Sequence, residues 1–344
     1  MRHRRWLARP AGGYARAPSS NKTSMTILLI LLVPVAIGAT LALITRTRAL
    51  GMPAAPTVFL YEGCTPHQDP PAIPKIIWSY WHTPERPLTV EWCLHSWGAH
   101  NPGWTIRSVH RENLAEFVDL AQLPAAFHDV TPMRQSDWLR LYFLRRYGGV
   151  WLDASFILTE SLDWLIAAQT GSRADYLGFY LDKYTTRPDC PIIDSWCMAA
   201  PAGSRFVEAW FAEFSLAMTM GDAAYLASLQ STGGAERLLQ KLPRPDYLMI
   251  HVTAQRVLER GGPYRLHLIR AEDSAYYYQA LSSWKRLGFF TRILLNRRPH
   301  LPPPLIKLRG GERRKLEPYL RHRLFSRHSI VGTHLDPRAM GRPS

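Results

Sequence analysis

The chain has 344 residues, of which 47% are hydrophobic and 11% aromatic, so it is long enough for one large α/β domain with additional segments. Its net charge of +15 is uneven, because residues 1–48 carry eight Lys and Arg and no acidic residue, and residues 291–344 carry thirteen Lys and Arg against three acidic residues. No basic motif interleaved with aromatic residues is present, so we expect no nucleic-acid partner.

A hydrophobic segment near the N-terminus, residues 26–44, contains nineteen residues and no charge, about the length that crosses the apolar part of a membrane. It follows a basic tail at residues 1–25, so we predict a single-pass transmembrane helix that anchors the chain. A cleaved signal peptide is the alternative, but the apolar run is long for one, and residues 45–48 are not a small-residue cleavage site.

Two membranes are possible for this anchor. Six basic residues precede the span and two follow it, which favours a cytoplasmic N-terminus and suits a type II membrane protein of the Golgi. The single Asn-x-Ser/Thr site, Asn21, lies in the tail, and the lack of such a site in the body favours a bacterial inner membrane instead. We expect the bacterial inner membrane, with the Golgi as the alternative.

Residues 45–72 are rich in proline and small residues and indicate a stem. After the stem, patterns of apolar residues predict strand, helix, strand and helix in turn, over residues 73–81, 90–97, 104–109 and 111–120. This order predicts a mostly parallel sheet with helices on its faces, as in Rossmann-like α/β folds.

The segment from Thr131 to residue 160 is predicted as helix, tight turn and strand. Thr131 is a good N-cap, and Gly148 and Gly149 end the helix before a short apolar strand. That strand delivers Asp153 to its carboxyl end, the edge of an open α/β sheet where ligands bind. Within the helix, Asp137 and Arg140 lie three positions apart and therefore share one face, although such pairs are often only solvated surface pairs.

Further strands are predicted at residues 174–180 and 196–200, with a polar loop over residues 181–194 between them. The last part of the chain, residues 281–344, is predicted as a basic tail. Its first segment combines aromatic and aliphatic residues with Lys and Arg and could lie at a membrane interface, with a solvated tail as the alternative. The spacing of the four cysteines matches no zinc site and leaves the disulfide state open: Cys64, Cys93, Cys190 and Cys197.

The central segment SDWLRLYFLRRYGGVWLDAS, residues 136–155, resembles the SDxxR…GGxYxDxD core of a group of glycosyltransferases. That group includes capsular polysaccharide synthesis proteins, Golgi mannosyl- and galactosyltransferases and glucosylating bacterial toxins. IPKIIWSYWH at residues 73–82 and SWCMAAPAGSRF at residues 195–206 are also similar to it, nearest to its capsular branch. The resemblance implies a GT-A domain over residues 73–280. It also implies transfer of a sugar, with retention, from a nucleotide sugar to a polysaccharide or glycolipid.

The resemblance also implies roles for individual residues. The catalytic set would be Asp137, Arg140 and Asp153. Donor-binding residues would be these three together with Trp78, Ser79, Trp81, Gly148, Gly149 and Ser155. Asp194 and Trp196 would contact the acceptor. For Trp78 a place in the hydrophobic core is an equally good interpretation, and the segment around Asp194 could be only the entry to a strand.

A divalent cation, Mn²⁺ or Mg²⁺, is the expected cofactor. The family signature is Asp-x-Asp, whereas this chain has Ser155 two residues after Asp153, and a serine hydroxyl is a weaker ligand than a carboxylate for a hard cation. We predict a metal bound by Asp153, Ser155 and His251, with a weakly bound or absent metal as the alternative. A histidine on an apolar segment is more often structural.

Two other functions are consistent with the same residues. The departure at Ser155 allows a catalytically silent sugar-binding scaffold in a polysaccharide assembly complex. Asp137 and Asp153 could instead form the acid/base pair of a hydrolase, but the adjacent Arg140 would keep Asp137 ionised and make it a poor acid.

Overall fold

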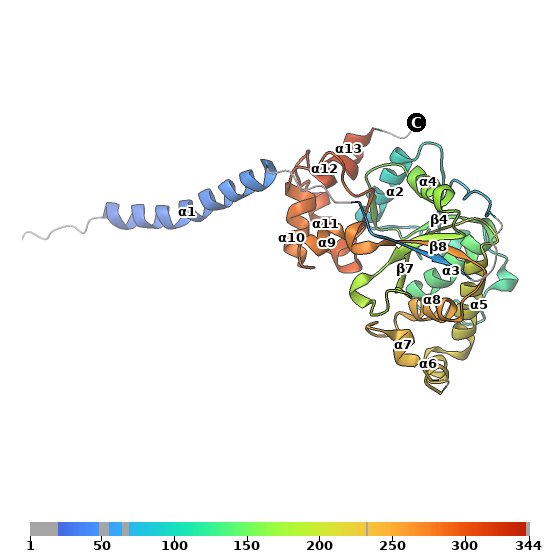
Figure 1. Ribbon diagram of the computed structural model, residues 1–344. Helices are drawn as coiled ribbons and strands as arrows, with labels where there is room; N and C mark the ends of the chain where they lie inside the picture. Colours follow the sequence, from blue (N-terminus) through green and yellow to red (C-terminus); the bar gives the residue numbers. More distant parts are fainter. Residues whose placement is uncertain (1–19, 48–54, 64–68, 232, 342–344) are drawn as a thin grey trace, which may run out of the picture. The chain divides into compact units, whose positions relative to one another are not determined.

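The computed structural model describes residues 20–47, 55–63, 69–231 and 233–341, and it divides the chain into two compact units, residues 1–44 and 45–344. Helix α1 (Ser20–Thr47), most of which belongs to the first unit, covers the predicted span (Figure 1). Among the residues with described structure, no helix is both long enough and apolar enough to cross a membrane. The predicted transmembrane anchor at residues 26–44 is therefore not supported, and the cellular location stays a prediction. Residues 1–19 of the predicted basic tail lie outside the described residues.

The second unit is built around a seven-stranded sheet in the order β1-β8-β6-β7-β4-β2-β3. Five strands run in one direction, and β1 and β7 run in the other, so the sheet is mixed but mostly parallel, as predicted. A separate two-stranded sheet joins β5 to β9. The strands are β1 Val58–Glu62, β2 Ile76–Tyr80, β3 Thr105–Val109, β4 Gly149–Leu152, β5 Phe156–Leu158, β6 Tyr176–Tyr180, β7 Ile193–Ala200, β8 Arg265–Arg270 and β9 Leu305–Lys307.

Helices cover both faces of the seven-stranded sheet (Figure 1). Successive side chains of a strand point to opposite faces, so Trp151 of β4 joins the core under α3, α5 and α8, whereas Val150 and Leu152 join the core under α2. The helices of the second unit are α2 Leu88–His100, α3 Pro132–Tyr147, α4 Asp163–Ser172, α5 Arg205–Met220, α6 Asp222–Ser231, α7 Ala235–Leu239, α8 Met249–Arg260, α9 Tyr277–Leu281, α10 Arg286–Phe290, α11 Gly310–Arg321, α12 Ile330–His334 and α13 Pro337–Met340.

One predicted helix, over residues 111–120, is replaced by two short 3₁₀ turns, Arg111–Glu116 and Leu120–Gln122. Side chains of the segment bind its own backbone. Asn113 accepts a hydrogen bond from the backbone N–H of His110, and Asp119 accepts one from the backbone N–H of Ala121. Such local bonds compete with a continuous helix.

The stem predicted at residues 45–72 contains a strand of the main sheet. Val58–Glu62 forms β1, which pairs antiparallel with β8 at the edge of the sheet. Alternate side chains of β1 are partly buried, which is the pattern of an edge strand with one covered face. Residues 48–54 and 64–68 of the predicted stem lie outside the described residues.

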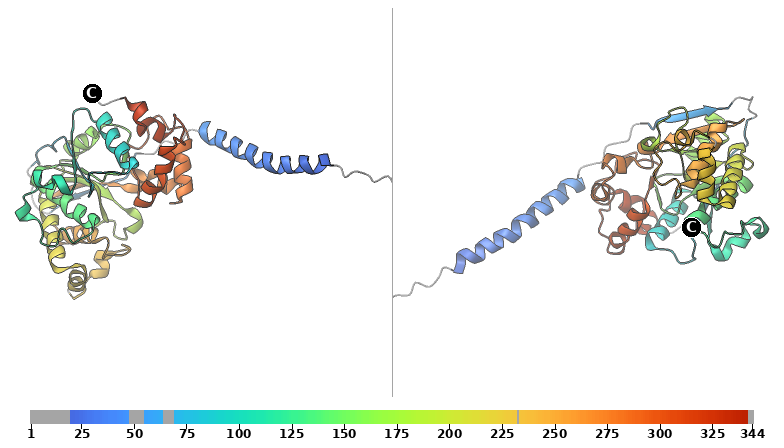
Figure 2. Two further views of the ribbon diagram at one scale, coloured as in Figure 1. Left: turned by 180° about the vertical axis from the view of Figure 1, so that it is seen from behind. Right: turned by 90° about the horizontal axis from the view of Figure 1, so that it is seen from below.

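Residues 281–341 belong to the segment 281–344 that was predicted as a basic tail, but they fold onto the body instead. β9 pairs with β5, and Phe289, Ile293, Leu316 and Ile330 are buried in the core that also holds α2. In both views of Figure 2, the C-terminal helices lie against the body. The prediction of a separate tail is wrong for these residues, because their aromatic and aliphatic side chains fill the protein's own core.

Candidate functional site

Helix α3 and strand β4 are joined by a turn that only glycine fits. The hydroxyl of Thr131 accepts a hydrogen bond from the backbone N–H of Arg134 at 3.3 Å, which caps the start of α3 as predicted. Gly148 ends the helix with a φ of +67°, and Gly149 follows with a φ of +102°. A Cβ on Gly149 would lie 2.6 Å from a backbone oxygen of β2. The tight turn brings Asp153, just beyond β4, beside the side chains of α3.

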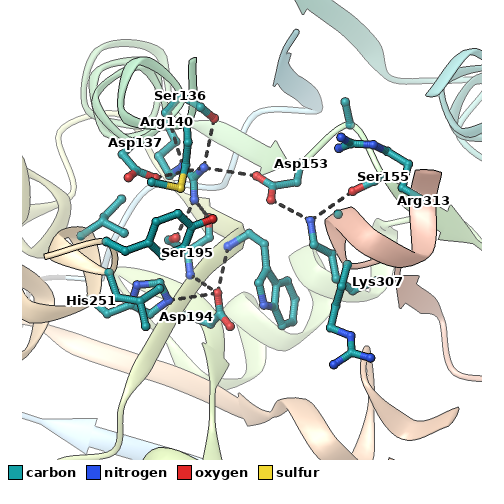
Figure 3. A pocket seen from close by; sticks show the side chains of 18 of the residues that line it. Ser136, Asp137, Arg140, Asp153, Ser155, Asp194, Ser195, His251, Lys307 and Arg313 are labelled. Carbon is teal, nitrogen blue, oxygen red and sulfur yellow. Dashed lines mark hydrogen bonds and ion pairs between the residues drawn. The ribbon is translucent and has the colours of Figure 1, made fainter. Parts of the chain in front are cut away.

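A cavity of about 700 Å³ opens where β2 and β4 end and the antiparallel strand β7 begins (Figure 3). Trp81 lines it after β2, Asp153 and Ser155 line it after β4, and Asp194 lines it from β7. Parts of α3, α8 and α11 complete the wall. The volume lies in the range of roughly 300–1,000 Å³ that is usual for small-molecule sites. The cavity also lies at the sheet edge where α/β folds bind ligands.

The guanidinium group of Arg140 connects the elements around this cavity. Its Nη1 donates to the carbonyl oxygen of Ser195 at 2.8 Å and to the hydroxyl at 2.5 Å, and its Nε and Nη2 donate to the carbonyl and hydroxyl oxygens of Ser136. Nη2 is also 3.3 Å from Oδ1 of Asp137 and 3.3 Å from Oδ1 of Asp153. Arg140 thus makes four hydrogen bonds to Ser136 and Ser195 and two ion pairs to the carboxylates, and in this way it organises the site.

Asp137 and Asp153 share this guanidinium but differ in their titration. Burial raises the pKa of Asp137 above its usual value, although Arg140 and Arg134 oppose the rise. Burial would also raise the pKa of Asp153, but Lys307 and Arg140 outweigh it, and that pKa lies below its usual value. Asp153 is thus held ionised at the cavity wall, with its side chain 26% exposed.

Beside Asp153, the cavity has a basic wall, by which we mean Lys183, Lys307, Arg309, Arg313 and Arg314. Lys307 is the last residue of β9, and Nζ lies 2.7 Å from Oδ2 of Asp153. Arg313 belongs to the first turns of α11, and its guanidinium carbon lies 4.6 Å from the centroid of the Trp81 ring. The wall is suited to anionic groups because its charge exceeds that of the three aspartates that line the cavity.

This basic wall was not predicted from the sequence. Four of its five residues lie in the segment that was predicted as a tail, far in sequence from Asp153. Two features of the sequence could have indicated the residues of the basic wall. Ser155 left the motif short of one negative charge, and the segment RGGERR at residues 309–314 places two glycines and several basic residues at the start of a helix.

The residues predicted to bind a metal do not fit one. Ser155 donates its hydroxyl proton to the carbonyl oxygen of Leu308 at 3.0 Å and accepts from Lys307 at 3.2 Å. Lys307 also holds Asp153, and the third predicted ligand, His251, is 3.5 Å from Asp194 instead. In the described part of the chain, no three His, Cys, Asp or Glu residues are grouped as ligands of a metal ion. The side chains are arranged around an ammonium group, and we derive no step through a metal.

Four residues that were predicted to contact the donor are not among the described residues that line the cavity. Trp78 is buried, stacks on Phe143 with 4.6 Å between ring centroids, and donates from Nε1 to the carbonyl oxygen of Gly148. Its place is in the core, where it supports the turn. Ser79 is buried in β2, and the turn itself requires Gly148 and Gly149. By contrast, Trp81 and Ser155 line the cavity.

The residues predicted for the acceptor, Asp194 and Trp196, line the cavity together with His251. Asp194 accepts hydrogen bonds from the backbone N–H groups of Ser195 and Trp196 at 2.6 and 3.4 Å. The indole Nε1 of Trp196 and Nδ1 of His251 are buried and have no hydrogen-bond partner among the described residues. An unpaired buried polar group costs about 1–3 kcal/mol, so these atoms favour a ligand rich in hydroxyl groups or water.

Residues 61–215 match the model of a family described as capsular polysaccharide synthesis protein. The match confirms the resemblance predicted from the central motif. It includes α3, β4 and the Asp137, Arg140 and Asp153 cluster, and it ends before β9 and α11, which carry most of the basic wall.

Curated relatives are glycosyltransferases by name. The chain is 26% identical over 157 residues to "O-glycosyltransferase braB" of Annulohypoxylon truncatum, covering 41% of this chain and 37% of that protein. It is 29% identical over 149 residues to "O-glycosyltransferase PaGT" of Phomopsis amygdali, covering 38% and 36%. The chain thus matches little more than a third of the length of each relative. A solved structure, "PaToxG Glycosyltransferase", aligns with a TM-score of 0.34 and 13% identity over 55% of this chain and 81% of that one.

Proposed function

We propose that the protein is a glycosyltransferase that moves a sugar from a nucleotide-sugar donor to a hydroxyl group of a polysaccharide or glycolipid. The class is supported by the family match and by the names of the curated relatives. The word O-glycosyltransferase in those names favours a hydroxyl group as the acceptor.

One observation carries the proposal. A single guanidinium, that of Arg140, fixes two carboxylates at the ligand-binding edge of the sheet, and the basic wall lines the same cavity, beginning at Lys307 beside Asp153. Carboxylates accept hydrogen bonds from sugar hydroxyls, and clustered Lys and Arg bind a diphosphate. The cavity therefore has a surface complementary to the sugar of a nucleotide sugar and another complementary to its diphosphate.

Roles for the residues follow from this division. The ionised Asp153 accepts hydrogen bonds from hydroxyl groups of the sugar or the ribose, while the basic wall holds the diphosphate. Arg140 is a positioning residue that keeps Asp137, Asp153 and Ser195 in place. Trp196 and His251 line the same cavity and are the residues that we place beside the acceptor. No residue is assigned as a general base, since the leaving diphosphate can take the proton of the acceptor hydroxyl, as in a retaining transfer.

The hydrolase alternative meets a geometric obstacle. A raised pKa for Asp137 and a lowered pKa for Asp153 are what an acid and a nucleophile would need. However, Nη2 of Arg140 is 3.3 Å from Oδ1 of each carboxylate, so the guanidinium fills the space in which a glycosidic oxygen would have to lie.

The test follows release of nucleoside diphosphate by the full-length protein, offered a panel of nucleotide sugars and simple glycoside acceptors. Arg140→Lys should reduce the turnover with the preferred donor on the order of 100-fold, because a lysine cannot hold four partners in one plane. Arg145→Lys is the matched control, since Arg145 lies on the same helix but pairs with Glu208 at the surface.

Each rival function has its own outcome in this assay. Nucleotide binding without any release would indicate the silent scaffold. Cleavage of a glycan in the absence of a nucleotide would indicate the hydrolase, and either result would contradict the proposed transfer.

A further inference from the structure

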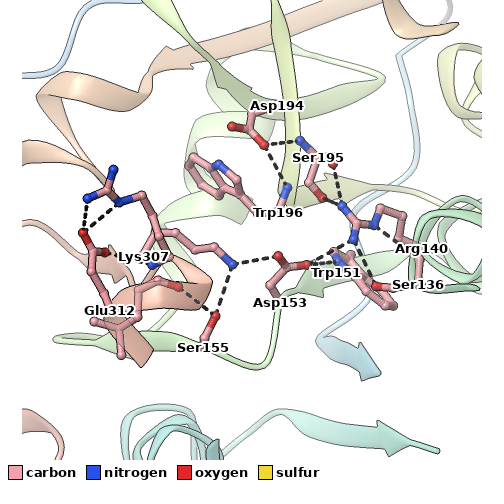
Figure 4. Close-up of polar contacts among 12 residues, drawn as sticks. Ser136, Arg140, Trp151, Asp153, Ser155, Asp194, Ser195, Trp196, Lys307 and Glu312 are labelled. Atoms are coloured by element: carbon pink, nitrogen blue, oxygen red, sulfur yellow. Dashed lines mark hydrogen bonds and ion pairs between the residues drawn. The ribbon is translucent and has the colours of Figure 1, made fainter. Parts of the chain in front are cut away.

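An ammonium group lies where the first and third residues of the motif would hold a metal ion. Nζ of Lys307 is 2.7 Å from Oδ2 of Asp153 and 3.2 Å from Oγ of Ser155 (Figure 4). The lysine is only 7% exposed. A buried lysine that bridges both motif residues is a cation supplied by the protein itself.

The backbone holds Lys307 firmly in this place. It pairs with Phe156 across the β5–β9 sheet, and Nζ lies 5.0 Å from the centroid of the Phe156 ring. The N–H of Lys307 donates to the carbonyl oxygen of Ala275 at 3.0 Å, and its own carbonyl oxygen accepts from Nε2 of Gln279 at 2.6 Å. The ammonium group is therefore positioned before any ligand arrives.

Ser155 matches a monovalent ammonium better than a divalent ion. Its hydroxyl proton is committed to the carbonyl oxygen of Leu308, so its oxygen can accept from Lys307 without adding negative charge. Mg²⁺ and Mn²⁺ favour carboxylate ligands, and an aspartate at position 155 would supply one. A neutral serine at position 155, in place of the second aspartate of Asp-x-Asp, thus suits the ammonium group of Lys307.

The rest of the basic wall extends the positive surface from Lys307 along the cavity. Arg313 and Arg314 line the same cavity from the start of α11, a helix of twelve residues whose N-terminal dipole also favours anions. Stacking on Trp81 orients the Arg313 guanidinium. A diphosphate beside Lys307 would have these charges within the same cavity.

We propose that Lys307, with Arg313 and Arg314, neutralises the diphosphate of the donor, so that this site binds a nucleotide sugar without a divalent cation. This inference rests on the proposed function. During transfer, the bond between C1 of the sugar and the diphosphate oxygen breaks, and its electron pair stays on that oxygen. The acceptor oxygen bonds to C1 and loses its proton to the diphosphate. The ammonium and guanidinium groups offset the charge that develops on the leaving diphosphate.

The test measures binding of uridine, guanosine and adenosine diphosphate to the full-length protein by calorimetry, once with EDTA and once with Mn²⁺. One of the three should bind with the same dissociation constant, within about twofold, in both buffers. In EDTA, Lys307→Met should weaken that binding at least about tenfold, the loss expected for a hydrogen bond to a charged group. Lys315→Met is the matched control, because Lys315 is exposed on α11 and does not line the cavity.

Lys307 also pairs with Asp153 inside the fold, so Arg313→Gln serves as a second variant, and thermal unfolding of both variants is recorded. Arg313→Gln should weaken binding in EDTA about fivefold or more. Wild-type affinity in both variants, or binding that requires Mn²⁺ and disappears in EDTA, would overturn the inference while the proposed function stands. A protein that binds none of the three nucleotides in either buffer would contradict the proposed function itself, and the inference with it.

Discussion

Two aspartates contact the same Nη2 atom of Arg140, yet their surroundings differ. Asp137 is almost fully buried on α3, where the cost of desolvation exceeds the attraction of its arginine partners. Asp153 has Lys307 as an additional partner, and its carboxylate form is favoured. Neutral substitutions at the two positions should therefore change stability in opposite directions.

Asp137 has a raised pKa in the folded protein. Its contribution to stability is thus complete below the pKa of the unfolded chain, roughly 3.9, and is lost as the pH rises through the folded pKa. Asp137→Asn should consequently raise the free energy of unfolding at pH 7, and the gain should shrink as the pH falls to 4. Urea unfolding of the variant and the wild type at both pH values measures this, and a loss of stability at pH 7 would contradict it.

Asp153 has a lowered pKa, so its contribution is present above roughly pH 3.9 and is lost only as the pH falls through the folded pKa. Asp153→Asn should lower the free energy of unfolding at pH 7 by about 1–3 kcal/mol, because it deprives the buried ammonium of its carboxylate. The deficit should persist at pH 4. The same urea experiment tests it, and an unchanged midpoint at pH 7 would rule out a stabilising pair with Lys307.

The sequence allowed prediction of some site residues and concealed others. Asp137 and Arg140 share a helix face, and a short strand leads to Asp153, so local spacing was enough to group these three. Lys307 joins them only through strand pairing, across 154 positions of the chain. Trp78 was uncertain from the sequence, because a tryptophan in a central strand can serve the core or a ligand, and its contact with the Gly148 carbonyl is a tertiary feature.

Among the elements, the small sheet of β5 and β9 has the largest effect on the site. It fixes three pairs, Phe156 with Lys307, Ile157 with Ile306 and Leu158 with Leu305, and all six residues are buried. Strands of three residues show too little periodicity to be predicted from sequence. The longer elements α2, α3 and β2 were predicted because their apolar spacing extends over a full strand or several helical turns.

Ile306→Ala tests whether β9 belongs to the core of the body. Ile306 is 1% exposed, so the substitution should lower the free energy of unfolding by about 2–5 kcal/mol. Leu301→Ala is the control, because Leu301 is 56% exposed and should change stability by less than about 0.5 kcal/mol. Chemical denaturation gives both values. Equal effects of the two substitutions would mean that the segment does not contribute to the core.

At the scale of the molecule, the free cysteines report on the integrity of the body. Cys93, Cys190 and Cys197 are free and buried. Burial raises the pKa of Cys93 to about 12 and that of Cys190 to about 11, and it also raises the pKa of Cys197. The thiolate is the reactive form, so both access and ionisation protect these residues in the folded protein.

A thiol-labelling experiment makes this protection measurable. Cys64 lies outside the described residues, so it is removed by Cys64→Ser. At pH 8 the folded variant should show no rapid reaction with a disulfide reagent, and three thiols should react at once in denaturant. Because Cys93 and Cys197 belong to the core that also holds α11 and α12, rapid labelling of either one in the folded protein would mean that this core opens independently.

The pairing of Asp153 with Lys307 has a consequence for how the chain is made. A ribosome adds about 5–20 residues per second, so roughly 8–30 seconds separate the synthesis of these two residues, which lie 154 positions apart. During that interval α3 and β4 can form, but Asp153 lacks its ammonium partner and the cavity lacks its basic wall. A nascent chain therefore has no complete ligand site until β9 and α11 have left the ribosome, and a chain that stops before β9 never acquires one.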